Sequence, residues 1–318
     1  CLTNAVAAAE VGHEPNVKVT AATRIDWVFA LSNQSPAKPP ANWLVGYDSL
    51  AQTYERYVPA GIKKGDAYGL VLFISPGDRA TGHEPFRKIC DERKLIFASP
   101  QAAGNSTETR QRVRIVLDVL DDLRRLYKID PDRTYLGGFS GGGRIACAIG
   151  FSLPEYFGGV LPVCAAGDLR EEPWLRQRVI DRLSVAHLTG ETDFNRGEVE
   201  RFRGAMLTDV GVRSKVWVVP QTGHAIPSTL WLNKAIEWLE EAAPQRREYA
   251  RVYPASRSSP SDQPAREECA QQLLTEGQER LKNKNKSYSG LMQLKGVLER
   301  WPDVDAAKTA RESLTKYE

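Results

Sequence analysis

The sequence predicts an α/β protein with a doubly wound, mostly parallel β-sheet, and two observations carry that prediction. Several short runs are continuously apolar, as expected for strands that are covered on both faces. Segments with apolar residues at helical spacing lie between those runs, so strand and helix alternate along the chain. In such a sheet, ligands bind at the carboxyl ends of the strands, and functional residues are expected in the loops that follow them.

The first part of the chain has weaker patterns. Residues 1–23 are predicted to be flexible, and residues 32–50 contain three prolines and are predicted to form a loop. Residues 24–31 have the composition of a strand. Residues 52–59 alternate apolar and polar side chains, which is typical of a half-buried strand.

The main α/β domain is predicted to span residues 24–243. The apolar runs that predict its buried strands lie at residues 69–75, 95–99, 134–138, 159–164, 185–189 and 215–219. The patterns that predict its helices lie at residues 84–93, 109–128, 142–152, 196–210 and 228–242.

A second, smaller unit is predicted at the C-terminal end. Residues 244–264 are rich in proline and serine and are expected to form a linker. Residues 265–318 place apolar residues at helical spacing, with an interruption at Pro302, and predict two or three helices that weakly resemble one tetratricopeptide unit. One such unit cannot bury its own apolar face, so we expect a helical extension that packs on the main domain or on a partner.

The composition excludes several classes of function. The 318 residues carry a net charge of +3 with basic and acidic residues interspersed, so a nucleic acid is not an expected partner. No stretch approaches the ~18 consecutive apolar residues of a membrane-spanning helix. None of the five cysteines belongs to a C-x-x-C pair, which argues against a structural zinc site.

The first residues favour an exported protein. The chain begins at Cys1, and residues 4–10 are small residues of the kind found at a signal cleavage site. Cys1 is either the lipid-modified first residue of a lipoprotein or part of a signal peptide cut near Ala9; the alternative is an arbitrary boundary. We therefore expect a secreted or periplasmic protein, or one anchored by a lipid at Cys1.

The motif Gly-Phe-Ser-Gly-Gly at residues 138–142 is the strongest functional signal. It directly follows a predicted strand and precedes a predicted helix, which distinguishes it from an ordinary glycine-serine loop. A serine on such a sharp turn adopts a strained backbone and exposes its hydroxyl above the sheet. It also lies at the positive end of the helix, which stabilises a developing negative charge. Ser140 is therefore the candidate nucleophile.

A serine hydroxyl needs a base to accept its proton, and the chain has four histidines. His13 lies in the N-terminal segment, His83 near the start of the first helix, and His187 inside a predicted strand. Only His224 follows the last strand, where a base is delivered in folds of this kind. His224 is predicted to be the general base rather than a loop or capping histidine.

The base in turn needs a carboxylate that fixes its tautomer. Asp193 follows the penultimate strand and completes the order Ser…Asp…His. Glu191 in the same loop and Asp168 after the preceding strand are alternatives. Each of these carboxylates is otherwise a solvated loop residue.

An oxyanion needs two backbone N–H donors. One is expected from Gly141, the residue after the nucleophile. The other is expected from the loop after residues 69–75. Pro76 has no N–H, so Gly77 or Asp78 must be the second donor.

These segments together resemble the esterase branch of the α/β-hydrolase superfamily that includes polyhydroxybutyrate depolymerases and feruloyl or acetylxylan esterases. The resemblance covers roughly residues 50–242. The chain departs from those enzymes at Pro76-Gly77, where they typically have His-Gly. The resemblance implies hydrolysis of a small or polymer-linked ester, such as a feruloyl, acetyl or polyhydroxyalkanoate ester, through an acyl-enzyme. It implies no metal and no organic cofactor.

Substrate contacts are less well defined. Trp174 either lines an acyl or aromatic pocket or anchors its segment to the core, and Phe139 is a second pocket candidate. Two other functions stay open. One is a serine peptidase of the same fold, because the same triad cleaves amides; the other is a non-catalytic scaffold that works through its helical tail.

A disulfide between Cys147 and Cys164 is a further expectation. Cys147 lies two turns into the helix after the serine motif, and Cys164 ends the next strand. The intervening chain folds back on itself, which favours approach of the two side chains, and export would supply an oxidising compartment. The alternative is a pair of buried free thiols.

Overall fold

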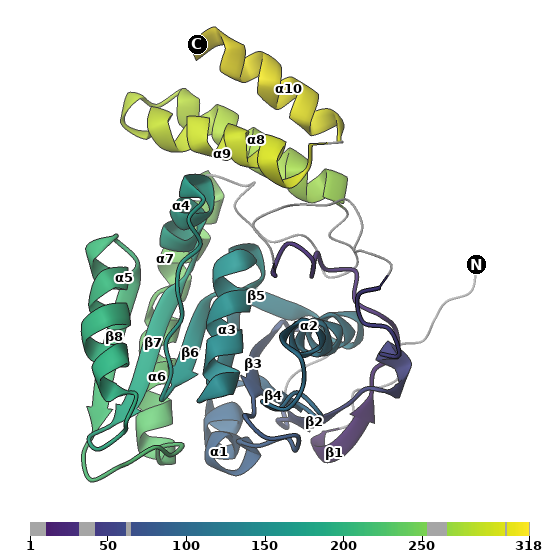
Figure 1. The fold of residues 1–318 in the computed structure, drawn as a ribbon, viewed down its shortest axis with the longest axis vertical. Coiled ribbons are helices and arrows are strands. Elements are labelled where there is room, and N and C mark those ends of the chain that lie inside the picture. The colour runs from purple at the N-terminus through teal and green to yellow at the C-terminus, as the bar shows by residue number, and fades with distance from the viewer. Residues whose placement is uncertain (1–10, 32–41, 62–64, 253–265, 303, 318) are drawn as a thin grey trace.

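The structure is a computed structural model, and it describes residues 11–31, 42–61, 65–252, 266–302 and 304–317. Within them, eight strands form one sheet in the order β1-β2-β4-β3-β5-β6-β7-β8 (Figure 1). β2 is antiparallel to both β1 and β4, and all other pairs are parallel. The predicted mostly parallel sheet is confirmed. The strands are β1 (Gly12–Lys18), β2 (Thr53–Val58), β3 (Tyr68–Ile74), β4 (Leu95–Pro100), β5 (Ile129–Phe139), β6 (Gly159–Val163), β7 (Ser184–Gly190) and β8 (Arg213–Val219).

Helices cover both faces of the sheet because its central strands are apolar on both sides. In β3, Leu70 and Leu72 enter one core cluster, and Val71 and Phe73 enter the other. Helices α2, α3 and α4 pack on the first face, and α1 and α6 on the second (Figure 1). The helices of this domain are α1 (His83–Arg93), α2 (Thr109–Leu126), α3 (Gly141–Ser152), α4 (Pro173–Arg182), a π-helical segment (Glu198–Gly204) that continues into α5 (Ala205–Asp209), α6 (Thr229–Glu241) and α7 (Ala243–Val252).

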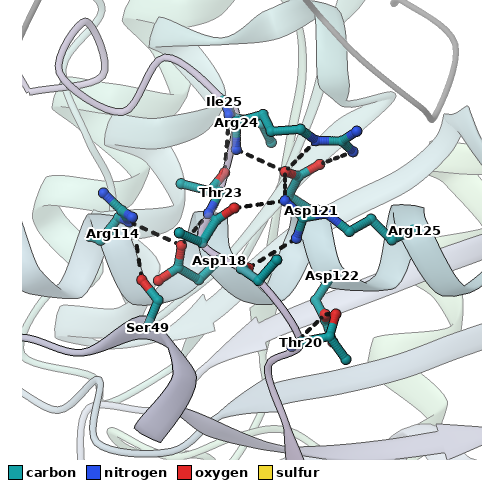
Figure 2. A network of polar contacts seen from close by, with 12 residues as sticks. Thr20, Thr23, Arg24, Ile25, Ser49, Arg114, Asp118, Asp121, Asp122 and Arg125 are labelled. Carbon is teal, nitrogen blue, oxygen red and sulfur yellow. Dashed lines mark hydrogen bonds and ion pairs between the residues drawn. The ribbon is translucent and has the colours of Figure 1, made fainter.

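Residues 11–23 have a defined structure, so the prediction of flexibility is wrong for them; residues 1–10 lie outside the described residues. β1 adds an edge strand beside β2. Residues 19–25 lie along α2. Three fully buried aspartates of α2 accept hydrogen bonds from the main-chain N–H groups of this segment (Figure 2). These bonds join Thr20 N to Asp122 (2.9 Å), Thr23 N to Asp118 (2.7 Å) and Arg24 N to Asp121 (2.8 Å).

Residues 24–26 are irregular and residues 27–31 form turns, so the predicted strand is wrong there. Their apolar side chains are nevertheless buried, and Ile25 and Phe29 are each 2% exposed. Main-chain hydrogen bonds form within the segment, for example from Leu31 N to Val28 O at 3.1 Å. The composition therefore indicated burial correctly but not the backbone conformation.

Among the described residues, three α-helices follow the main domain: α8 (Arg266–Leu281), α9 (Ser287–Arg300) and α10 (Asp305–Leu314), coloured yellow-green to yellow in Figure 1. They pack on the main domain through α4. The indole N–H of Trp174 donates to Glu299 at 3.1 Å, and a Cβ on Gly296 would lie 2.4 Å from the Trp174 ring. The buried ion pair Arg178–Glu276, at 2.6 Å, joins α4 to α8.

Helix α7 occupies the first part of the predicted linker, so that prediction is wrong for residues 244–252; residues 253–265 lie outside the described residues. The polar composition of this segment suggested a solvated connection. Arg246, however, is only 4% exposed and donates to the main-chain oxygen of Asp132 at 2.5 Å. Its long side chain therefore docks α7 onto the first residues of β5.

The predicted disulfide is wrong, because Cys147 and Cys164 are free thiols. Cys147 belongs to the core cluster on one face of the sheet and Cys164 to the cluster on the other, so the sheet separates them. Cys1, the candidate lipid-anchor residue, lies outside the described residues. No helix in the described part of the chain is both long and apolar enough to cross a membrane.

Candidate active site

Ser140 lies on a sharp turn between β5 and α3. Its backbone has φ 53° and ψ −123°, a strained conformation for a residue with a side chain. The neighbouring glycines are required by crowding: a Cβ on Gly138 would lie 2.4 Å from the main chain of Gly142, and one on Gly142 would lie 2.1 Å from Ile74 O. The motif thus raises the serine hydroxyl above the carboxyl end of the sheet, as predicted.

The three residues predicted to form a triad come together at this edge. His224 follows β8, and its Nε2 lies 2.9 Å from Ser140 Oγ. Asp193 follows β7, and its Oδ1 lies 2.7 Å from His224 Nδ1. With the Nδ1 proton donated to the carboxylate, Nε2 is the acceptor for the serine proton.

Asp193 is only 5% exposed and is held by bonds besides that to His224. The Thr189 hydroxyl donates to it at 2.7 Å and the Asn195 N–H at 3.0 Å. Burial alone would raise the pKa of Asp193, but the bonds from His224, Thr189 and Asn195 outweigh it and lower the pKa below its usual value. The carboxylate is therefore ionised at neutral pH and suited to stabilise an imidazolium.

The two alternative acids do not take this position. Glu191 is exposed, and its carboxylate accepts the N–H of Gln221 at 2.8 Å, which shapes the loop that carries His224. Asp168 is also exposed. The bond from His224 Nδ1 to Asp193 thus selects one of the three carboxylates considered from the sequence.

The expected oxyanion donors lie beside the turn. Gly141 begins α3, so its N–H is one of the unpaired donors of a helix N-terminus. The Gly77 N–H instead donates to Ser75 Oγ at 3.1 Å. Among the described residues the Asp78 N–H has no hydrogen-bond partner, so Asp78 rather than Gly77 is the available second donor.

Of the predicted pocket residues, Phe139 lies at the site and Trp174 does not. The Phe139 ring lies 4.9 Å from the His224 ring. Trp174 is 1% exposed and packs between α4 and α9, so the prediction that it lines a substrate pocket is wrong and the anchoring alternative is correct. Its large apolar ring suited either role in the sequence.

Three neighbours of the triad were not predicted. Phe194 is 77% exposed and stacks on His224, with ring centroids 4.1 Å apart. Cys164 lies against Asp193, and burial together with that carboxylate raises the pKa of its thiol to about 12. The Asn105 side chain lies over Gly141, where a Cβ would come within 2.0 Å of its oxygen. Phe194 directly follows Asp193, but nothing in its residue type indicated contact with the base.

The metal-binding capacity of this site is limited by its own hydrogen bonds. Cys164, Asp193 and His224 have donor atoms within 4.8 Å of one another. The Asp193 and His224 atoms that face each other are engaged in the triad bond, and the Cys164 thiol has a raised pKa that disfavours the thiolate.

A sheet of this strand order, with a strained serine after β5, a carboxylate after β7 and a histidine after β8, defines the α/β-hydrolase fold. No protein-family model matches the chain, and no curated protein matches it.

Solved structures similar to this chain include a thermostable esterase (22% identity, TM-score 0.48, 60% of this chain and 59% of that one). They also include an S-formylglutathione hydrolase from Staphylococcus aureus (13% identity, TM-score 0.46, 61% of this chain and 90% of that one). A third is an esterase from Thermogutta terrifontis (16% identity, TM-score 0.45, 62% of this chain and 89% of that one). The match thus spans about three fifths of the thermostable esterase.

Proposed function

We propose that the protein is a serine hydrolase that cleaves carboxylic esters through an acyl-enzyme. The observation that carries the proposal is the continuous line of contacts from Ser140 Oγ through the His224 ring to the buried Asp193. A hydroxyl, a base and an orienting carboxylate at these distances are what nucleophilic acyl transfer requires.

The reaction follows from this geometry. Ser140 Oγ attacks the ester carbonyl carbon while His224 Nε2 accepts its proton, and Asp193 stabilises the resulting imidazolium. The N–H groups of Gly141 and Asp78 stabilise the tetrahedral oxyanion. When the intermediate collapses, the C–O bond to the alcohol breaks, and the alcohol leaves with the proton from His224. A water molecule, deprotonated by His224, then attacks the acyl group on Ser140 and releases the acid.

The proposed substrates are small or polymer-linked esters outside the cytoplasm, such as feruloyl, acetyl or polyhydroxyalkanoate esters. Support comes from the aromatic rings of Phe194 and Phe139 beside the base, of which Phe194 is largely exposed. An exposed ring at this place suits an apolar or aromatic group of a substrate. The small residues at positions 4–10 support export.

A fluorophosphonate probe tests whether the site is a live serine hydrolase. Wild-type protein should be labelled at Ser140, and Ser140→Ala should not be labelled. Ser313→Ala, on α10, is the matched control and should be labelled as wild type is. Failure to label wild-type protein, with no turnover of any ester, would favour the non-catalytic scaffold.

A substrate panel then tests the bond that is cleaved. Short-chain p-nitrophenyl esters, methyl ferulate, acetylated xylan and polyhydroxybutyrate should be compared with peptide substrates. We expect turnover of at least one ester class and none of the peptides. Faster cleavage of peptides than of esters would instead assign a serine peptidase.

A further inference from the structure

Three side chains with metal-binding atoms meet at the edge of the sheet formed by β1 and β2: His13 of β1, Glu55 of β2 and His83 at the start of α1. Their donor atoms all lie within 4.8 Å of one another. The strand register explains the meeting. His13 is paired with Tyr57, so Glu55, two residues earlier on β2, is its diagonal neighbour on the same face.

The contacts within this group are close. His13 Nε2 lies 2.7 Å from Glu55 Oε1. The rings of His13 and His83 are stacked, with centroids 3.9 Å apart and planes 3° from parallel. His83 is only 7% exposed, and its Nε2 is buried without a hydrogen-bond partner among the described residues. A buried polar atom left without a partner is costly, and it calls for an explanation such as a bound ion.

We propose that His13, Glu55 and His83 bind one divalent transition-metal ion, of which zinc is the best match to the donor set. Two imidazoles and one carboxylate are typical zinc ligands, and three protein ligands leave a coordination position for water. The cysteine spacing argued against a structural zinc site, but this site uses no cysteine. It is also independent of the proposed ester hydrolysis, which uses no metal.

The groups around the site largely favour a cation. Glu84, whose carboxylate lies 3.7 Å from His83 Nδ1, adds a second negative charge, whereas Arg87 opposes binding.

Binding requires one local movement. The lone pair of an imidazole nitrogen lies in the ring plane, so two parallel rings cannot both point at one ion. The His13 side chain is 38% exposed and can turn, whereas His83 is held in the core. The ion would then tie the edge strand β1 to β2 and to α1, and thereby stabilise the sheet edge.

The test uses the full chain without a histidine tag. Zinc titration by calorimetry and the visible absorption of bound cobalt should both show one ion per chain. Zinc should raise the melting temperature of wild-type protein, because an ion that binds only the folded state stabilises it. His13→Gln and Glu55→Gln should each weaken zinc binding at least ~10-fold, since even the loss of an outer-shell partner costs that much.

Two controls identify the site. Glu84→Gln keeps all three proposed ligands and should bind zinc within a few-fold of wild type. His224→Gln removes the competing group of Cys164, Asp193 and His224, and should also keep the zinc. His13→Gln is the decisive variant because His13 is partly exposed, and circular dichroism of the metal-free protein checks that it folds.

Three results would overturn the proposal. They are no zinc binding by wild-type protein at micromolar zinc, affinity unchanged in both His13→Gln and Glu55→Gln, or binding lost only in His224→Gln. Loss in His13→Gln and Glu55→Gln, with retention in Glu84→Gln and His224→Gln, would establish the site.

Discussion

At the scale of single residues, Asp193 owes its place beside His224 to the loop after β7, which also supplies the Asn195 N–H that holds its carboxylate. We expect Asp193→Asn to lower ester turnover about 10⁴-fold, because an amide disfavours the tautomer of His224 that can accept the serine proton. Glu191→Gln and Asp168→Asn should cost far less. Initial rates with a p-nitrophenyl ester measure all three, and a greater loss in Asp168→Asn would identify Asp168 as the acid instead.

His187, on β7, is a buried histidine, and its burial predicts that the folded protein loses stability in acid. It is fully buried, both ring nitrogens lack hydrogen-bond partners among the described residues, and burial lowers its pKa to about 4. The unfolded chain binds a proton near pH 6.5, whereas the folded chain does so only near pH 4. His187 therefore contributes stability above pH ~6.5 that is lost as the pH falls toward ~4.

The expected loss from this residue between pH 7 and pH 4.5 is about 2–3 kcal/mol in the free energy of unfolding, since each pKa unit corresponds to ~1.4 kcal/mol. Urea unfolding of wild type and His187→Leu at both pH values isolates it. The leucine variant should lose less stability on acidification by that amount. Parallel curves for the two proteins would show that His187 is not protonated on unfolding.

At the scale of elements, α2 holds the N-terminal segment through its buried carboxylates (Figure 2). Asp121 accepts three bonds from Arg24, at 2.8, 3.0 and 2.8 Å, and one from Arg125 at 2.9 Å. Burial alone would raise the pKa of Asp121, but the bonds from Arg24 and the charge of Arg125 outweigh it and lower the pKa. The segment is thus fixed by charge rather than by a continuous strand.

Asp121→Asn should lower the free energy of unfolding by about 3 kcal/mol, because it leaves two arginines without their shared carboxylate. It should also accelerate cleavage by trypsin after Arg24. Asp209→Asn, an exposed aspartate on α5, is the control and should change stability by less than about 0.5 kcal/mol. Equal trypsin cleavage rates in wild type and Asp121→Asn would contradict the proposed restraint.

At the scale of the whole molecule, the C-terminal helices pack far from the nucleophile. Ser140 lies at the start of α3, whereas Arg300 of α9 pairs with Glu155, at 3.6 Å, just beyond the end of α3. Twelve residues of α-helix span about 18 Å. The extension therefore supports the domain without lining the site.

Gly296→Ala tests that separation. Its Cβ would lie 2.4 Å from the Trp174 ring, so we expect a loss of about 1–3 kcal/mol of stability from overpacking, with kcat/KM unchanged well below the melting temperature. Gly197→Ala is the matched control, because Gly197 has a helical φ of −59° and nothing within 4 Å of its missing Cβ. Urea unfolding and ester kinetics measure both effects. A fall in kcat/KM in Gly296→Ala alone would couple the extension to the site.

Sequence predicted the parts of the molecule that depend on local pattern. Buried parallel strands are apolar along their length, and the serine turn needs adjacent glycines, so both leave a signature. β1 is a polar edge strand that contains a proline, and Asp121 meets Arg24 across 97 positions in the sequence. The spacing of apolar residues does not reveal such contacts. It likewise does not reveal the contact of Phe194 with His224 or of Trp174 with α9.

The strained backbone of Ser140 lowers the stability of the fold, but the same conformation exposes the nucleophile. A glycine adopts φ 53° and ψ −123° with less strain than a serine does, and strain of this kind costs about 1–3 kcal/mol. Ser140→Gly should therefore be inactive but more stable than both wild type and Ser140→Ala, which keeps the strain. Selection for a durable fold alone would erase the nucleophile, so a lineage freed from the need for the reaction is expected to acquire glycine at this position early.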